Sequence, residues 1–253
     1  MMKAWSRRLA LAFQFLTVVR VRVAGPVTDG ELRGSTFFHP VVGAALGGVL
    51  AAAAWALAHA LPWPVVVALV VVGLVALTGG LHLDGLADVC DGFYAGRNRE
   101  DALRIMKDPH IGTMGVVGLV CVLGLKYIAL LNVPTDRVLL AIVAAPVVGR
   151  SAMVVACALG RYAREEGTGK TYIGQLGHVH ALVAIAFAAA GCAMLWEWKA
   201  AALAFALSAI WLALFVRACN RRIGGLTGDT LGALCETTEL IVWLSACVNC
   251  CAA

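Results

Sequence analysis

Three aspartates in the first half of the chain have a spacing that suits a metal ion. Asp84, Asp88 and Asp91 lie at offsets that an α-helix brings onto one narrow stripe. Carboxylates this close repel one another unless they are protonated or neutralised by a cation. Their oxygen atoms suit a hard ion such as Mg²⁺ or Mn²⁺, which keeps other coordination positions open for water and phosphate. The stripe therefore predicts a metal site for phosphate chemistry, in preference to a merely solvated helix face.

A second acidic segment near the end of the chain repeats this logic. Asp229, Glu236 and Glu239 share one helical face, and a glycine-rich stretch that contains Thr227 precedes them. Glycine lets a backbone approach a ligand, and free amides at a helix start often hold phosphate. Taken alone, this segment equally suits a capped interfacial helix. Together with the first stripe, it predicts two acidic helices that share one or two metal ions.

Basic residues follow the first stripe and are candidate ligands for phosphate oxygens. Arg97, Arg104 and Lys107 could clamp such oxygens, although ordinary loop charge explains Arg97 nearly as well. Asp108 and His110 flank a proline that stiffens the turn, which makes both stronger candidates for a functional role.

Two cations stand inside apolar runs, where a charge costs at least about 2.5 kcal/mol. Arg150 lies near the middle of its run, so we expect it to pair with an acid or to reach a phosphate. Lys126 is interpreted as a residue whose long side chain extends toward a membrane surface.

The elements that carry these residues are predicted to be membrane helices. Hydrophobic residues make up 61% of the 253 residues and charged residues only 14%, which excludes an ordinary water-soluble domain. The apolar runs are continuous and do not alternate, so helices fit better than a barrel. We expect one all-α, polytopic membrane domain over residues 1–253, with six to seven spans. The runs are 37–61, 64–81, 113–132, 137–159, 179–196 and 200–216, with a seventh possible at 241–253.

The basic residues are distributed unequally between the loops. Of the 20 Lys and Arg residues, all but four fall before the first run or in the three long polar loops, two of which carry the acidic segments. The positive-inside rule places that side in the cytoplasm. The same distribution assigns the net charge of +5 to membrane orientation and gives no reason to expect nucleic acid.

Residues 79–92, Gly-Gly-Leu-His-Leu-Asp-Gly-Leu-Ala-Asp-Val-Cys-Asp-Gly, closely resemble the cobalamin synthase family, also called adenosylcobinamide-GDP ribazoletransferases. Further blocks resemble the same family in a consistent order along the chain. They are residues 13–17, 105–108, 111–115 and 224–233, followed by Glu236 and Glu239.

The resemblance implies a transferase of the last stage of vitamin B12 assembly, in a bacterial cytoplasmic (inner) membrane with the active site facing the cytoplasm. Its substrates would be adenosylcobinamide-GDP and α-ribazole or α-ribazole 5′-phosphate, and its products adenosylcobalamin or its 5′-phosphate, plus GMP. All six carboxylates are then expected to hold Mg²⁺ on the diphosphate, and His82 or Asp108 to accept the hydroxyl proton. The expected substrate-binding residues are Gly79, Gly80, Arg97, Arg104, Lys107, His110, Arg150 and Thr227.

Two other functions share part of this pattern. Asp88, Asp91 and Gly92 copy the front of a CDP-alcohol phosphotransferase motif, but its later acidic block is missing. A divalent-cation transporter would place acids at mid-membrane depth, whereas the only deep charges expected here are cationic. The sequence is also compatible with a homo-oligomer.

Overall fold

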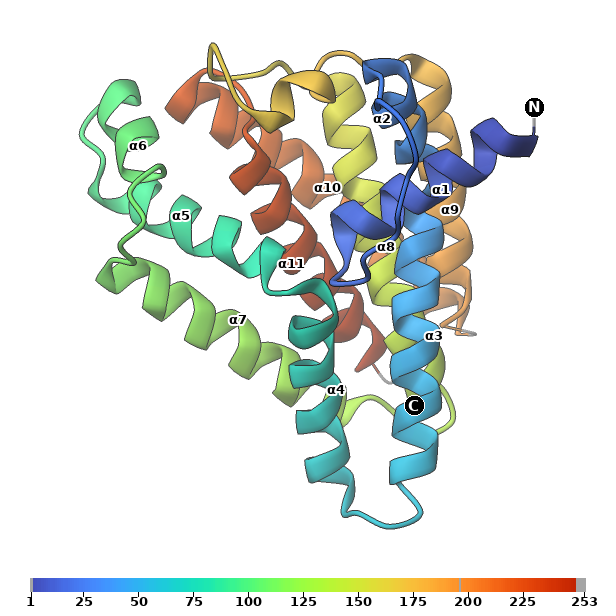
Figure 1. Cartoon of the computed structure of the whole chain (residues 1–253). Helices are drawn as coiled ribbons and strands as arrows, with labels where there is room; N and C mark the ends of the chain where they lie inside the picture. The colour runs from blue at the N-terminus through green and yellow to red at the C-terminus, as the bar shows by residue number, and fades with distance from the viewer. Residues whose placement is uncertain (1, 196, 249–253) are drawn as a thin grey trace.

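Helices make up nearly all of the regular structure in the computed structural model, which describes residues 2–195 and 197–248. Within these residues there is no strand, only an isolated bridge between Tyr162 and Leu226. The all-α fold class is confirmed (Figure 1). The helices are α1 (Met2–Leu16), α2 (Asp29–Ser35), η1 (Thr36–Phe38), α3 (His39–Leu57), α4 (Trp63–Thr78), α5 (Leu81–Ala95), α6 (Arg99–Ile105), α7 (Thr113–Asn132), α8 (Val138–Leu159), η2 (Thr168–Thr171), α9 (His178–Ala193), α10 (Trp198–Ile223) and α11 (Gly228–Ala246).

Several of these helices are long and apolar enough to cross a membrane, as expected of a polytopic membrane protein. Four candidates pass by length and composition: the segment Asp29–Leu57 that ends in α3, and helices α7, α8 and α10. The bent pair of α4 and α5 would make five. This count is below the expected six to seven, partly because α9 has only 16 residues. The possible seventh span lies partly outside the described residues, and α11 ends at Ala246.

The run expected as one span at 64–81 is broken by a sharp turn. Gly79 and Gly80 both adopt left-handed backbone angles, with φ of +61° and +72°, which strain any residue with a side chain. Helix α5 therefore leaves α4 at 92°. This angle, and the three aspartates on α5, argue against one continuous span over α4 and α5.

Helix α8 occupies the centre of the bundle. In its most apolar window 83% of the residues are buried, against 28% in α7 and 22% in α10. It packs against α3, α9 and α11, and α11 in turn packs against α5, α7 and α10. Figure 1 shows α5 crossing the bundle at the level of α1, while α3 and α4 run to a loop at the opposite end. The two acidic helices thus meet in the part of the bundle away from the loop between α3 and α4 (Figure 1).

Helices α5 and α11 approach each other closely enough that their backbones touch. A Cβ added to Gly85 would lie 2.6 Å from the carbonyl oxygen of Asp229, and one added to Gly232 would lie 3.0 Å from that of His82. The two glycines therefore permit a contact that side chains would prevent. Asp84 and Asp88 come to lie beside the start of α11.

Candidate active site

Asp84 and Asp88 of α5 and Asp229 of α11 form an acidic cluster. Burial, followed by the nearby charges of Asp229 and Asp84, raises the pKa of Asp88 to about 7. Burial also raises the pKa of Asp229, against the opposing effect of Arg164. The cluster therefore concentrates negative charge that a bound cation would neutralise.

Arg164 is a member of this site that the sequence did not reveal. Its Nη2 donates to Oδ2 of Asp229 at 2.9 Å, and its side chain is only 14% exposed. Two backbone hydrogen bonds hold its loop against the start of α11: Ala163 N–H donates to the Leu226 carbonyl at 2.9 Å, and Leu226 N–H to that of Arg161 at 2.8 Å. Arg164 stands 65 positions before Asp229, so no local spacing could have connected the two.

Asp91 is on the predicted stripe but has a different partner. Its two carboxylate oxygens accept hydrogen bonds from the backbone N–H groups of Gly112, at 2.7 Å, and Gly115, at 2.8 Å. Both amides belong to the start of α7, where free N–H groups and the helix dipole attract a carboxylate. Asp91 therefore joins α5 to α7 through both of its carboxylate oxygens.

Glu236 and Glu239 are occupied by the two deep cations. Lys126 Nζ lies 2.6 Å from Glu236 Oε2 and 2.5 Å from Glu239 Oε2, and Arg150 pairs with Glu239 Oε1. The expectation that Arg150 pairs with an acid is confirmed. The interpretation of Lys126 as a surface-reaching side chain is wrong, because it is 1% exposed and turned inward to these acids.

The six predicted metal ligands thus divide into three groups, and only Asp84, Asp88 and Asp229 share one place. Among the described residues, no three His, Cys, Asp or Glu side chains are already spaced to hold a metal ion. The donor chemistry still fits Mg²⁺, since the three are oxygen ligands whose mutual repulsion favours a cation. Arg164 neutralises part of this negative charge through its ion pair with Asp229.

Several predicted substrate-binding residues have structural roles. Gly79 and Gly80 form the turn between α4 and α5. Thr227 caps α11: its hydroxyl accepts from the Thr230 N–H at 3.3 Å and donates to Asp229 at 3.3 Å. Arg104 is exposed and pairs with Asp101 at 2.5 Å, and the backbone N–H of Arg97 donates to the same carboxylate.

The loop between α6 and α7 carries the remaining candidates. Asp108 and His110 contact each other at 2.7 Å, and Lys107 and His110 are exposed. Hydrogen bonds from the His110 backbone and ring lower the pKa of Asp108, which makes that carboxylate a weak proton acceptor. Within the described residues, Asp108 pairs with His110 and makes no hydrogen bond or ion pair with the acidic cluster.

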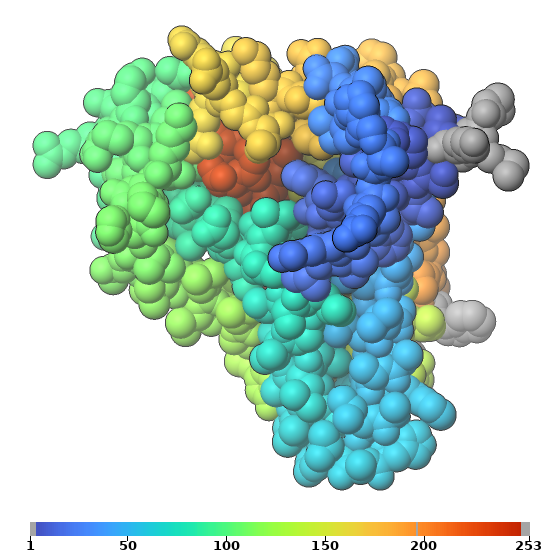
Figure 2. All heavy atoms as spheres, in the orientation of Figure 1, coloured from blue at the N-terminus to red at the C-terminus, as the bar shows by residue number. Residues whose placement is uncertain are grey.

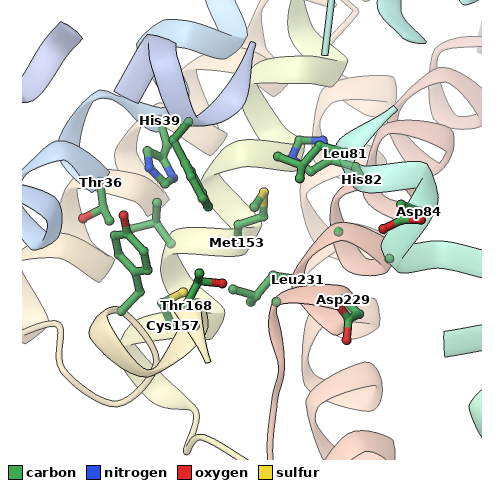
Figure 3. Close-up of a pocket in the computed structure, with 17 residues that line it drawn as sticks. Thr36, His39, Leu81, His82, Asp84, Met153, Cys157, Thr168, Asp229 and Leu231 are labelled. Atoms are coloured by element: carbon green, nitrogen blue, oxygen red, sulfur yellow. The ribbon is translucent and has the colours of Figure 1, made fainter. Parts of the chain in front are cut away.

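A cavity of about 150 Å³ opens beside the cluster, between α3, α5, α8, α11 and η2. Asp84 and Asp229 are at one end of it, and His39, Met153 and Cys157 extend into its other part (Figure 3). Figure 2 shows the hollow on the surface, where the red atoms of the C-terminal region lie between the yellow loop segment and α5.

His82, a predicted catalytic residue, lines this cavity and is 1% exposed. Its Nδ1 lies 3.4 Å from Arg150 Nη2. A guanidinium can only donate, so Nδ1 accepts and the proton resides on Nε2. Burial and the charge of Arg150 also lower the pKa of His82. This tautomer makes His82 a neutral hydrogen-bond donor in the cavity wall, rather than a proton acceptor.

Comparison with known proteins identifies the family. The sequence profile of cobalamin-5-phosphate synthases matches residues 8–247. An adenosylcobinamide-GDP ribazoletransferase of Chlorobaculum parvum is 40% identical over 243 residues, which cover 94% of each chain. Proteins of the same name from Leptothrix cholodnii and Clostridium botulinum are 41% and 34% identical, with 96% of each relative covered. No solved structure matches the chain. The chain therefore belongs to the cobalamin-5-phosphate synthase family, as the resemblance of its acidic motifs implies.

Proposed function

We propose that this protein transfers the adenosylcobinamide phosphoryl group of adenosylcobinamide-GDP to a hydroxyl of α-ribazole or its 5′-phosphate, at the cluster of Asp84, Asp88 and Asp229. The observation that carries this assignment is the meeting of α5 and α11, because it joins the two acidic motifs of the family beside a cavity and the partly buried Arg164. The relatives carry the name of this reaction.

The reaction makes one bond and breaks one. The ribazole hydroxyl oxygen attacks the phosphorus on the corrinoid side of the diphosphate, the bond from that phosphorus to the GMP oxygen breaks, and the hydroxyl proton is released. Negative charge spreads over the phosphoryl oxygens during this step, so positioning and charge neutralisation provide most of the catalysis.

The residues divide this work. Asp84, Asp88 and Asp229 would hold Mg²⁺, which neutralises diphosphate charge when it is bound. Arg164 pairs with Asp229, and its other guanidinium N–H groups would donate to a phosphoryl oxygen. The buried pairs of Glu236 and Glu239 with Lys126 and Arg150 support the site from within the membrane.

The distribution of basic residues supports an orientation in which α6, η2 and the acidic cluster face the cytoplasm. A green fluorescent protein fused after Asn98 should then fluoresce, whereas one fused after Asp136 should not. The opposite pattern would overturn the orientation without affecting the assignment of the reaction.

The assay is GMP release by the purified protein in liposomes, supplied with both substrates and Mg²⁺. Removing divalent ions with EDTA should stop turnover, and restoring Mg²⁺ should recover it. Asp84→Asn and Asp88→Asn should each lower turnover at least 100-fold, whereas Asp136→Asn, a change at an exposed loop residue, should not. No product from folded wild-type protein would refute the transferase assignment, and wild-type turnover in both site variants would refute the metal assignment.

A further inference from the structure

The cavity beside the acidic cluster contains a region that phosphoryl transfer does not use. Among the described residues that line it, Asp84 and Asp229 are the only ones with a full charge, and both are at one end. The rest of the wall is apolar, aromatic or neutral and polar, including Met153, Leu231 and Thr168. A ligand that fills the cavity must therefore be neutral over most of its body and polar at one end.

One wall of the cavity is built from aromatic rings that come from three separate parts of the chain. The ring centroid of Phe15, on α1, lies 5.6 Å from that of Tyr172, which follows η2, and 6.0 Å from that of His39, on α3. The Phe15 and His39 rings are stacked. Such a wall favours a planar aromatic ligand, which can stack against it.

Two imidazoles add hydrogen-bonding groups to this mostly apolar wall. His39 and His82 are 5% and 1% exposed, and in the described part of the chain neither Nε2 has a hydrogen-bond partner. Figure 3 shows them on different sides of the cavity, with Met153 between them. A buried polar atom without a partner is costly, and a ligand atom can remove that cost. Because His82 carries its proton on Nε2, the ligand atom suited to it is an acceptor, such as a ring nitrogen.

We propose that this cavity binds the neutral heteroaromatic base of the acceptor nucleoside, and that the sugar end of the nucleoside points toward Asp84 and Asp229. A mostly apolar cavity of about 150 Å³ takes an aromatic ring of benzene size, so one ring of a two-ring base would occupy it while the rest of the base extends toward the opening. A corrinoid ring is far too large. This assignment rests on the proposed function, since it places the second substrate of that reaction.

Guanine, the base of the leaving nucleotide, is the competing occupant. Its edge carries several donors and acceptors, all of which need partners when buried. Away from Asp84 and Asp229, few side chains that line the cavity could supply them, whereas a benzimidazole needs only a stacking surface and one donor for its ring nitrogen. The cavity chemistry therefore favours the base of α-ribazole.

The first experiment measures binding of the base alone, so it does not depend on turnover. 5,6-Dimethylbenzimidazole is titrated into the purified protein in nanodiscs, in parallel with guanosine and with indene, which has a similar shape but no ring nitrogen. The wild-type protein should bind the benzimidazole roughly tenfold more tightly than indene, as expected for one hydrogen bond. In His82→Phe this preference should disappear. Tighter binding of guanosine, or an unchanged preference in His82→Phe, would overturn the proposal.

The second experiment fills the cavity. Met153→Trp should raise the KM for α-ribazole at least tenfold and leave the KM for adenosylcobinamide-GDP unchanged. Met194→Trp, at a partly buried methionine away from the cavity, is the matched control. If Met153→Trp does not fold, Leu231→Phe serves the same purpose. An unchanged KM for α-ribazole in a folded, cavity-filled variant would overturn the base site while leaving the transferase assignment intact. Absence of activity in the wild-type protein would instead refute the proposed function. The titration with 5,6-dimethylbenzimidazole would still test whether the cavity binds the base.

Discussion

Replacing Gly85 with alanine should separate the two acidic helices by a distance that the structure specifies. The added Cβ would lie 2.6 Å from the carbonyl oxygen of Asp229 and 2.8 Å from its Cα. Ordinary van der Waals contact begins at 3.4 Å, so the two backbones must move apart by about 0.8 Å. Neither contact is with a flexible side chain that could turn away.

A displacement of this size should affect catalysis more than folding. Misplacing reacting groups by about 1 Å can cost roughly 100-fold in rate. Overpacking costs about 1–3 kcal/mol, and the better helix propensity of alanine returns about 1 kcal/mol of that. We therefore expect Gly85→Ala to fold with a Tm within several degrees of wild type, and its kcat for GMP release to fall roughly 100-fold.

Gly48→Ala is the matched control, because Gly48 is also helical and a Cβ there meets nothing within 4 Å. It should keep wild-type kcat. Wild-type kcat in folded Gly85→Ala would refute the reasoning, since the close approach of α5 to α11 would then not position the carboxylates for the reaction.

Three further outcomes follow from the same contacts. Arg164→Gln should lower kcat roughly 100-fold or more, as loss of one donor to a transition-state oxygen does. Arg164→Lys should recover part of the lost kcat. Equal kcat in the wild type and both variants would exclude a contact between Arg164 and the phosphate. Glu239→Gln should lower the free energy of unfolding by about 3–5 kcal/mol, because Lys126 and Arg150 lose a buried partner. Denaturation in detergent measures this change. A decrease of less than about 1 kcal/mol would contradict the pairing of Glu239 with the two cations. Because the pKa of Asp88 is raised to about 7, the metal-free fold loses stability as the pH rises toward 7. Below pH 7, Mg²⁺ must displace the proton of Asp88 before it can bind. The rise in Tm produced by Mg²⁺ should therefore be larger at pH 8 than at pH 6, and Asp88→Asn should remove this difference.

The sequence predicts well those features that depend on neighbours along the chain. The offsets of Asp84 and Asp88 place them on one face of a helix, and the structure has that helix at Leu81–Ala95. Apolar run lengths predict α3, α7, α8 and α10 as spans. The turn at Gly79 and Gly80 was readable as a double-glycine break, but run length alone favoured a straight span.

What the sequence does not contain is the identity of partners that the fold brings together. Asp91 looks equivalent to Asp84 on the stripe, yet its partners are two backbone amides of another helix. The pairing of Glu236 and Glu239 had a usable signal: two cations deep in apolar runs require anions at a similar depth, and these glutamates lead directly into an apolar stretch. Arg164 had no such signal, because only the pairing of its loop with Leu226 places it at the site.

The buried pairs also have a consequence for how the protein is made. Lys126 precedes Glu236 by 110 residues and Arg150 precedes Glu239 by 89, so α7 and α8 leave the ribosome well before the helix that neutralises them. At a synthesis rate of roughly 5–20 residues per second, each cation waits on the order of 5–20 s for its partner. During that time each uncompensated charge opposes insertion by about 2.5–3.5 kcal/mol. We therefore expect the arrival of α11 to complete membrane integration as well as the active site, and a chain ended before Gly228 should be degraded rapidly in a pulse-chase experiment.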